Sequence, residues 1–269
     1  MSPLVLPLLM TRTTFDSNVW RVVVTPAVFP GESSAAAFAA IRAEIAAERM
    51  VGCLSETVFT LEAVKKIDRQ AFFAAYAAPL EVTETEKADG TISWAFQPAS
   101  GVVQPPLHPI LESHLQDAIA MGFRLLHCPR ILAPKPKLPQ SYYLADTNAT
   151  AADRAARFAE CSRELELLGA GIAHVKAIGA RYSNDPKRWI EGLAAAPASE
   201  SAAIAKAVAE WADADSVAAH YAYEADYFCT RDVASAAGTN TMLHPDQRAM
   251  LTSRFGVRFV FPEELAAIL

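Results

Sequence analysis

The stretch EWADADSVAAHYAYEADYFCTRD, residues 210–232, sets the predicted fold class, because it leads from a helix into a strand that an acidic residue follows. Its first part is rich in alanine, which favours a helix, and Asp213 and Asp215 lie where we expect that helix to open. The run ADYFC has the aromatic character of a strand, and Asp232 follows it after Thr230 and Arg231. A helix that leads into a strand in this way is the repeating unit of α/β proteins.

Other segments continue this alternation. Residues 13–24, TTFDSNVWRVVV, are β-branched and aromatic and predict a strand with an acidic break at Asp16. A helix over 33–50 and a buried strand, MVGCLS, come next, and Ser55 is placed to cap a helix over 56–76. The later predicted elements are helices over 109–121, 150–169, 186–195, 199–222 and 245–254 and from Pro262, with strands in FRLLHCPRI and GVRFVF. We therefore predict a three-layer α/β/α fold with a mostly parallel central sheet.

The 269 residues are 52% hydrophobic and 20% charged, which is the composition of a globular protein, and we predict one domain over 1–269. Residues 80–109 carry acids, Gly90, the alternating run TISWAF and several prolines. This pattern predicts an insertion, a polar hairpin or loop that lies outside the sheet as a mobile lid near the cleft. Residues 130–195 add further helical material.

The net charge of −6 excludes a protein that coats nucleic acid by bulk charge, so any RNA binding would need local basic patches. The four cysteines form no CxxC pair, as expected for buried, reduced thiols in a cytoplasmic protein. Residues 3–10, PLVLPLLM, are apolar but short and interrupted by prolines, unlike a signal peptide. No segment reaches the ~20 apolar residues of a spanning helix, so we expect no membrane partner.

Four regions that are far apart in the sequence each bring an acidic residue to a predicted edge of the sheet. Asp16 lies at the break after the first strand, and Asp232 follows the run DYFC. Asp213 or Asp215 comes from the helix before that run, and Glu56 and Glu62 follow the strand MVGCLS. Functional groups in open parallel sheets gather beyond the carboxyl ends of the strands. We therefore expect these carboxylates to meet at one edge of the sheet.

These motifs resemble a known family, the PIN domains. FDSNVW, residues 15–20, is similar to the opening strand of that family, and residues 213–232 resemble its closing signature, from the first Asp of a helix to Thr-x-Asp after a strand. RFGVRFVFPEEL resembles its last strand and helix. The resemblance covers roughly the first 75 and the last 60 residues, and residues 80–190 resemble no segment of it.

The resemblance implies a metal-dependent ribonuclease. Asp16, Asp213 and Asp232, together with an early glutamate, would surround one or two Mg²⁺ or Mn²⁺ ions, which prefer oxygen ligands. Ser17 and Thr230 would orient a ligand or water, Asn18 would fix the loop, and Arg231 would contact a phosphate or a neighbouring carboxylate. The partners that follow are an RNA substrate, an antitoxin-like protein and a second copy of the chain.

Two choices between acids stay open in the sequence. Glu62 lies one residue from the family spacing, whereas Glu56 lies in the first turn of its predicted helix, where an acid also favours the helix dipole. Asp213 matches the family spacing but is also placed to cap a helix, and Asp215 competes with it. Asp226 fits the turn that enters the last long strand.

Two basic clusters are candidate RNA-binding sites, with a solvated surface as the alternative. One is Arg130, Lys135 and Lys137, and in the other Arg181, Lys187 and Arg188 flank Trp189, an arrangement suited to stacked single-stranded bases. The competing functions are a PIN-like regulatory or binding module of the toxin–antitoxin type and a phosphatase of the haloacid-dehalogenase type. The phosphatase needs a second Asp two positions after the first, where this chain has Asn18.

Overall fold

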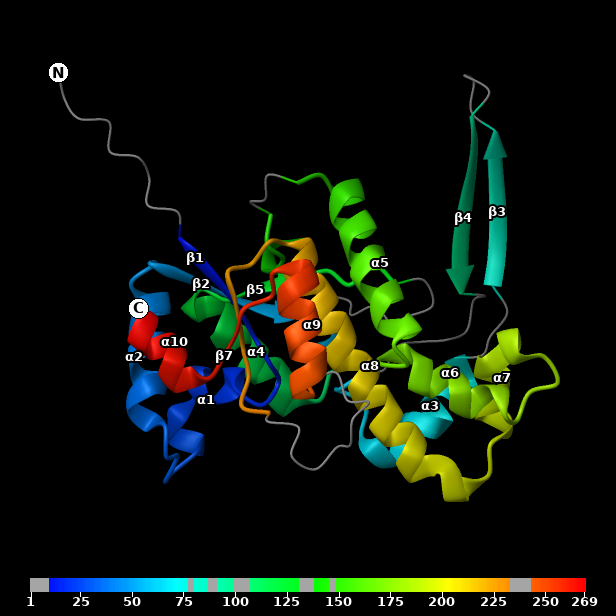
Figure 1. Cartoon of the computed structure of the whole chain (residues 1–269), viewed down its shortest axis with the longest axis horizontal. Coiled ribbons are helices and arrows are strands. Elements are labelled where there is room, and N and C mark those ends of the chain that lie inside the picture. Colours follow the sequence, from blue (N-terminus) through cyan, green and yellow to red (C-terminus); the bar gives the residue numbers. More distant parts are fainter. Residues whose placement is uncertain are drawn as a thin grey trace.

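A five-stranded parallel sheet forms the centre of the protein. The computed structural model describes residues 10–76, 80–86, 91–98, 107–130, 138–145, 149–232 and 243–269. The strands of the central sheet, in spatial order, are β5 (Arg124–Leu126), β2 (Met50–Ser55), β1 (Thr11–Phe15), β6 (Tyr227–Cys229) and β7 (Phe259–Val260), as Figure 1 shows. The predicted α/β class with a parallel central sheet is confirmed.

Helices cover both faces of this sheet, because successive residues of each strand point to opposite sides. Leu54, Leu125 and Cys229 belong to a core on one face, whereas their neighbours Cys53, Leu126 and Phe228 belong to a core on the other. The helices of the first face are α1 (Trp20–Val24), α2 (Ala35–Ala46), α4 (Pro109–Met121) and α10 (Pro262–Ile268). The helices of the second face are α5 (Ala151–Leu167), α8 (Ser201–Ala222) and α9 (Pro245–Phe255).

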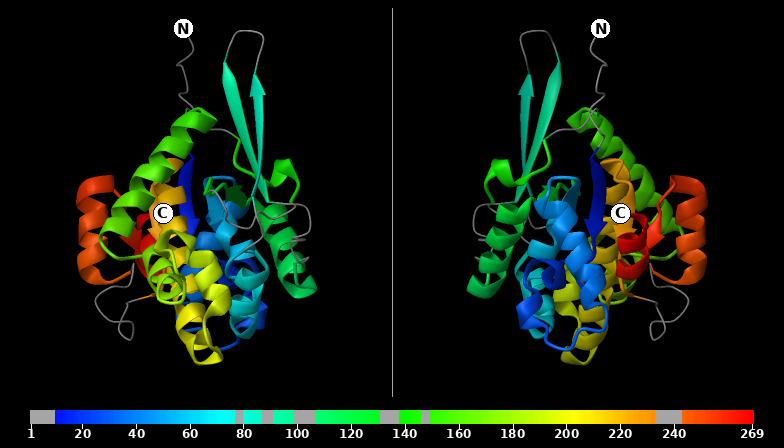
Figure 2. Two further views of the ribbon diagram at one scale, coloured as in Figure 1. Left: turned by 90° about the vertical axis from the view of Figure 1, so that its right-hand side faces the viewer. Right: turned by 90° about the vertical axis from the view of Figure 1, so that its left-hand side faces the viewer.

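A third core extends the molecule beyond the sheet. The first half of α8 packs there against α3 (Arg69–Tyr76), α6 (Ile172–Ala180) and α7 (Trp189–Ala195), as seen in Figures 1 and 2. Helices α6 and α7 touch through their backbones, since a Cβ added to Gly179 would lie 2.1 Å from the carbonyl oxygen of Trp189. Helix α6 lies within the helical material predicted over 130–195, although no separate helix was predicted at 172–180. Glycine at position 179 allows this close approach.

The order of the strands reverses beside β1. The chain moves outward from β1 to β2 and then to β5, returns through α5 to α8, and continues with β6 and β7 on the other side of β1. Ligands of open α/β sheets bind beyond the carboxyl ends of the strands at such a switch point. Asp16 follows β1 and Thr230 follows β6 at this position.

Two predicted elements differ from the structure. Residues 20–24 form helix α1 rather than the second half of a strand, because the carbonyl oxygen of Asp16 accepts hydrogen bonds from Val19 and Trp20 and turns the chain. Residues 56–76 are not one helix. They form 3₁₀ turns at Glu56–Phe59 and Lys66–Asp68 before α3. Ser55 caps the first turn as expected, but the Thr60 hydroxyl bonds to backbone carbonyls and competes with a regular helix.

A separate two-stranded antiparallel sheet corresponds to the first part of the expected insertion. It consists of β3 (Leu80–Glu86) and β4 (Ile92–Pro98), with Leu80 opposite Pro98. Figures 1 and 2 show this hairpin standing away from the central sheet. None of the helices that the structure describes is both long enough and apolar enough to cross a membrane.

We predict that the hairpin opens at lower free energy than the central sheet. An isolated two-stranded hairpin is marginally stable in water, whereas β1 is paired on both edges and covered on both faces. Amide hydrogen exchange should show faster exchange in β3 and β4 than in β1 and β6. Equal protection in the two sheets would contradict the prediction.

Candidate active site

Asp16 lies at the switch point and joins the ends of β1 and β6. Its side chain is only 6% exposed. The carboxylate accepts hydrogen bonds from the backbone N–H of Ser17 at 2.6 Å, from the Asn18 side chain at 2.9 Å and from the Thr230 hydroxyl at 2.6 Å. Thr230 is itself fully buried at the end of β6. These bonds fix the orientation of the Asp16 side chain between the two strands.

The loop after β6 is tied to the same point. The Asn18 side-chain oxygen accepts a hydrogen bond from the backbone of Arg231 at 3.1 Å, and the Thr230 hydroxyl accepts one from the backbone of Asp232 at 3.0 Å. The Arg231 side chain pairs with Glu32 at 2.7 Å. The neighbouring carboxylate that Arg231 contacts is thus that of Glu32. Asn18 fixes the loop, as the sequence implied.

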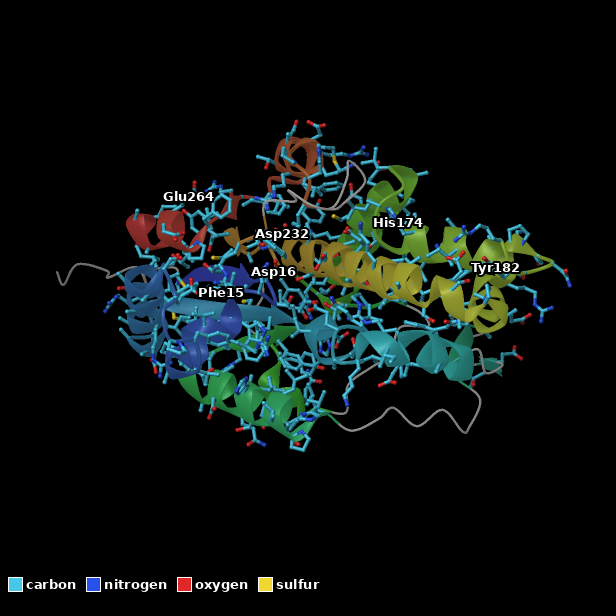
Figure 3. All side chains as sticks on the ribbon, turned by 90° about the horizontal axis from the view of Figure 1, so that it is seen from below. Phe15, Asp16, His174, Tyr182, Asp232 and Glu264 are labelled. Atoms are coloured by element: carbon cyan, nitrogen blue, oxygen red, sulfur yellow. The ribbon has the colours of Figure 1, made fainter. Side chains whose placement is uncertain are left out.

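Four carboxylates from distant segments come close enough to influence one another. They belong to Asp16, Glu62, Asp213 and Asp232. Burial raises the pKa of Asp16, and the charge of Asp232 raises it further, while the hydrogen bonds from Thr230 and Ser17 act in the opposite direction. Figure 3 shows Asp16 and Asp232 next to Phe15 at this edge of the sheet.

Glu62 and Asp213 are perturbed in the same direction. Burial, followed by the charge of Asp16, raises the pKa of Glu62 to about 7, although Ser17 and Arg69 partly oppose the shift. Burial also raises the pKa of Asp213 well above its usual range, and the charges of Asp16 and Glu62 add to the effect. Burial and the neighbouring carboxylates thus both disfavour the ionised forms of Glu62 and Asp213.

Two arginines lie beside this cluster, but the bonds described for them go to backbone carbonyls. Arg69 on α3 is 4% exposed and donates to Val64 and Ala205, and burial lowers its pKa. Arg248 on α9 donates to the carbonyl oxygens of Leu243 and Asp232. Neither arginine belongs to a motif that the sequence indicated as part of the site.

Asp213 and Asp215 lie on different sides of α8. Both are in the interior of this helix rather than at its start, so neither caps it, contrary to the expectation. Residues two apart on a helix point in nearly opposite directions. Asp213 faces the cluster, whereas Asp215 is fully buried, accepts two hydrogen bonds from Arg130 at 2.6 and 3.0 Å, and accepts a third from the Trp211 indole at 2.9 Å. Asp215 therefore has a structural role.

Glu56 also lies apart from the cluster. Its side chain is 2% exposed and accepts hydrogen bonds from the backbone of Cys128 at 2.8 Å and from the Tyr143 hydroxyl at 3.2 Å. His127 approaches it at 3.4 Å. The structure thus brings Glu62, and not Glu56, to Asp16. Asp226 enters the turn before β6 as expected, where it accepts a hydrogen bond from the backbone of Arg12.

Glu210 is an acidic neighbour of Asp213 that was not among the candidate site residues predicted from the sequence. It is buried on α8, and its charge contributes to the raised pKa of Asp213. The sequence could have indicated this neighbour, because Glu210 and Asp213 are three residues apart and such a spacing places two side chains on one face of a helix.

The predicted basic clusters are largely paired. Arg130 contacts Asp215 and Glu166, and Lys135 and Lys137 lie outside the described residues. Trp189 is partly buried and packs against the third core, with its ring 6.4 Å from that of Trp211. The neighbouring arginines form exposed ion pairs, Arg181 with Glu200 and Arg188 with Glu191.

The chemistry of the donor set fits a hard divalent cation. The cluster offers carboxylate oxygens next to the hydroxyls of Ser17 and Thr230. Among the residues described, no three acidic, histidine or cysteine side chains converge as a ready set of metal ligands. Mg²⁺ needs only one or two direct carboxylates and keeps several waters, so these oxygens can serve it without such convergence.

Comparison with protein-family models, curated proteins and solved structures finds no match for this chain. The fold and the site by themselves define the class. It is a three-layer α/β/α protein with a cluster of carboxylates at the switch point of its sheet.

We predict that the Glu62→Gln variant is more stable than wild type at high pH when EDTA is present. The pKa of Glu62 is about 7 in the folded protein against its ordinary 4.5, so its ionisation destabilises the fold. This cost is absent below about pH 4.5, grows as the pH rises, and is complete above about pH 7. Urea unfolding should show no difference at pH 4.5 and a gain of about 1–3 kcal/mol at pH 8.

The matched control is Glu112→Gln, which removes an exposed carboxylate from α4. The difference in the free energy of unfolding between this control and wild type should not change over the same pH range. A Glu62→Gln difference that is equally independent of pH would contradict the assignment.

We predict opposite effects for two neighbouring substitutions on α8. Asp215→Asn leaves the guanidinium of Arg130 without its buried partner and should destabilise the protein by about 3 kcal/mol. Asp213→Asn removes a charge that its neighbours disfavour, and without metal it should leave stability unchanged or raise it. Denaturant unfolding in EDTA at pH 8 measures both. Equal destabilisation by the two variants would refute the distinction between the two sites.

Proposed function

We propose that this protein is a metal-dependent nuclease that hydrolyses phosphodiester bonds in RNA, with Mg²⁺ or Mn²⁺ as its cofactor. One observation carries the proposal. Four carboxylates from four distant segments gather at the switch point of the sheet, where burial and mutual repulsion raise the pKa values of Asp16, Glu62 and Asp213. Such crowding of like charges is unfavourable for stability and is expected where a function requires it.

A divalent cation would balance this charge. Asp16, Asp213 and Asp232 would hold it, directly or through waters that the ion keeps, and the hydrogen bonds from Thr230 and Asn18 keep the Asp16 carboxylate in place. When bound, such an ion lowers the pKa of a coordinated water and neutralises charge that develops on the phosphate.

Glu62 would act as the general base that takes a proton from the attacking water. Its pKa of about 7 suits a group that accepts a proton from an attacking water and releases it again near neutral pH. Ser17 lies beside it, since a hydrogen bond from its hydroxyl favours the ionised form of Glu62. The Ser17 hydroxyl would thereby orient the general base.

RNA as the substrate rests on the resemblance to PIN domains, together with a few exposed cations near the site. Arg21 follows Asp16 on α1 and lowers the pKa of Glu62 by its charge, and Lys65 and Lys66 are exposed shortly after Glu62. These side chains would contact the phosphates of a bound strand. An antitoxin-like partner, a homodimer and a cytoplasmic location are proposals that rest on the resemblance alone.

The phosphatase alternative finds less support in the local geometry. In that chemistry, a second acid two residues after Asp16 would act on the leaving group. Asn18 occupies this position, donates to Asp16 and accepts a hydrogen bond from the backbone of Arg231. Its side chain is therefore committed to the loop.

We predict that Asp232→Asn abolishes metal-dependent cleavage. The wild-type protein should cut a fluorescently labelled single-stranded RNA with Mn²⁺ and not with EDTA. The rate of cleavage by the variant should be lower by a factor of about 100 or more. Mn²⁺ at a hundred times its dissociation constant should stabilise the wild-type protein by about 2.7 kcal/mol, and the variant by less.

The control Asp117→Asn removes an exposed carboxylate from α4 and should behave as wild type. A parallel assay with p-nitrophenyl phosphate distinguishes a phosphatase, which would release nitrophenol and leave the RNA intact. Full metal-dependent cleavage by Asp232→Asn would remove Asp232 from the site. The absence of any cleavage by wild type, with Mn²⁺ stabilisation retained, would favour a binding module.

A further inference from the structure

The main chain of Asp232 is held by side chains at both its N–H and its carbonyl group. The N–H donates to the Thr230 hydroxyl at 3.0 Å, and the carbonyl oxygen accepts a hydrogen bond from Nη2 of Arg248 on α9. A residue has only two soft backbone dihedrals, so fixing the peptide groups on both sides of Asp232 also fixes the direction of its Cβ. The direction of the Asp232 side chain therefore depends on Arg248 as well as on Thr230.

Arg248 binds two carbonyl groups with one edge of its guanidinium. Nε donates to the carbonyl oxygen of Leu243 at 2.9 Å, and Nη2 donates to that of Asp232. Leu243 is buried and directly precedes His244, which caps α9, so its carbonyl group is a fixed point. The planar guanidinium presents its donors in a rigid fork, which the single ammonium group of a lysine cannot reproduce. Arg248 thus holds the Asp232 carbonyl relative to the start of α9.

Two aromatic rings hold this guanidinium in place. Its central carbon lies 5.3 Å from the centre of the Phe259 ring and 5.9 Å from that of Phe261. Phe259 belongs to β7, and its ring packs against that of Phe228 on β6 with 5.5 Å between centroids. Arg248 therefore connects α9 and the last two strands of the sheet to the loop that carries Asp232.

The charge of Arg248 interacts with the acidic cluster. Burial lowers the pKa of Arg248, whereas the charges of Asp232 and Asp16 act in the opposite direction. A cation at this place repels a metal cation that binds to the same carboxylates, and so its charge alone opposes metal binding. Any favourable effect of Arg248 on metal binding must therefore come from the position that it gives to Asp232.

We propose that Arg248 is a positioning residue for metal binding at the acidic cluster, and that it acts by fixing the main chain of Asp232. The inference rests on the proposed function for the metal ion, but not on RNA as the substrate. Residues that orient a metal ligand without touching the metal contribute a factor of about 10–100 to its affinity. Removal of Arg248 should thus weaken metal binding, whereas removal of a cation that acted through its charge alone would strengthen it.

The first measurement is the dissociation constant of Mn²⁺ for the full chain without RNA, from the electron paramagnetic resonance signal of the free ion. Arg248→Met keeps the apolar stem and removes the guanidinium, and it should raise the dissociation constant about tenfold or more. Arg248→Lys keeps the charge but loses the two-point contact, and its dissociation constant should lie between those of wild type and Arg248→Met. The control Arg254→Met removes an exposed arginine of the same helix, which pairs with Glu164, and should leave the dissociation constant unchanged.

A double substitution shows whether Arg248 acts through Asp232. In an Asp232→Asn background, Arg248→Met should change the dissociation constant of Mn²⁺ much less than it does in the wild-type background, because the carboxylate that Arg248 positions is gone.

The second measurement needs no metal. Amide hydrogen exchange in EDTA reports how firmly the loop after β6 is held. The Asp232 amide should exchange faster in Arg248→Met than in wild type, whereas the amide of Phe228 within β6 should exchange at the same rate in both proteins. If Arg248→Met does not fold, Arg248→Lys decides in the same two measurements.

Three results would overturn the inference. They are unchanged or tighter Mn²⁺ binding by the folded arginine variant, an equally large effect in the Asp232→Asn background, and unchanged exchange of the Asp232 amide. A wild-type protein that binds no Mn²⁺ would instead refute the proposed function. Wild-type Mn²⁺ binding that the arginine variant retains in full would refute only the role of Arg248, so the two hypotheses fail in different ways.

Discussion

The arrangement of the site depends on the buried carboxylate of Asp16. Burying an ionised group is unfavourable unless hydrogen bonds replace its water, and three donors do so here, from Ser17, Asn18 and Thr230. The Thr230 bond reaches across from the adjacent strand β6, so the same interaction that satisfies Asp16 also fixes the loop that carries Asp232. At the switch point, side-chain hydrogen bonds as well as backbone hydrogen bonds thus join the ends of β1 and β6.

Buried and half-buried carboxylates in this protein fall into two groups according to how their charge is balanced. Asp215 is paired with Arg130 in a two-point contact, and Glu56 accepts hydrogen bonds from Cys128 and Tyr143. These groups hold elements together. Glu62 and Asp213 instead have their pKa values raised, because burial and neighbouring carboxylates outweigh the cations near them. The difference in balance, rather than the number of acids, separates structural carboxylates from candidate ligands.

Helix α8 makes this separation possible, because it spans two cores. Its second half packs on the central sheet, and its first half packs on α3, α6 and α7. Asp213 lies near the junction of the two, opposite the loop that carries Glu62. Arg69 donates to Ala205 on α8 and to Val64, and so links α8 to that loop. The helical extension is therefore part of the support of the acidic cluster.

The sequence alone determined the α/β class, most helices, and the positions of Asp16 and Asp232 after strands, because periodicity and strand ends are local properties of the chain. It also predicted Ser55 as a cap and residues 80–109 as an inserted hairpin or loop. Only the tertiary structure separated Glu62 from Glu56 and Asp213 from Asp215. Each of these acids is assigned by the residues that it contacts in the fold. Asp215 contacts Arg130, Glu56 contacts Tyr143, and Asp213 lies near other carboxylates. These partners come from distant segments of the chain, so no local sequence pattern predicts them.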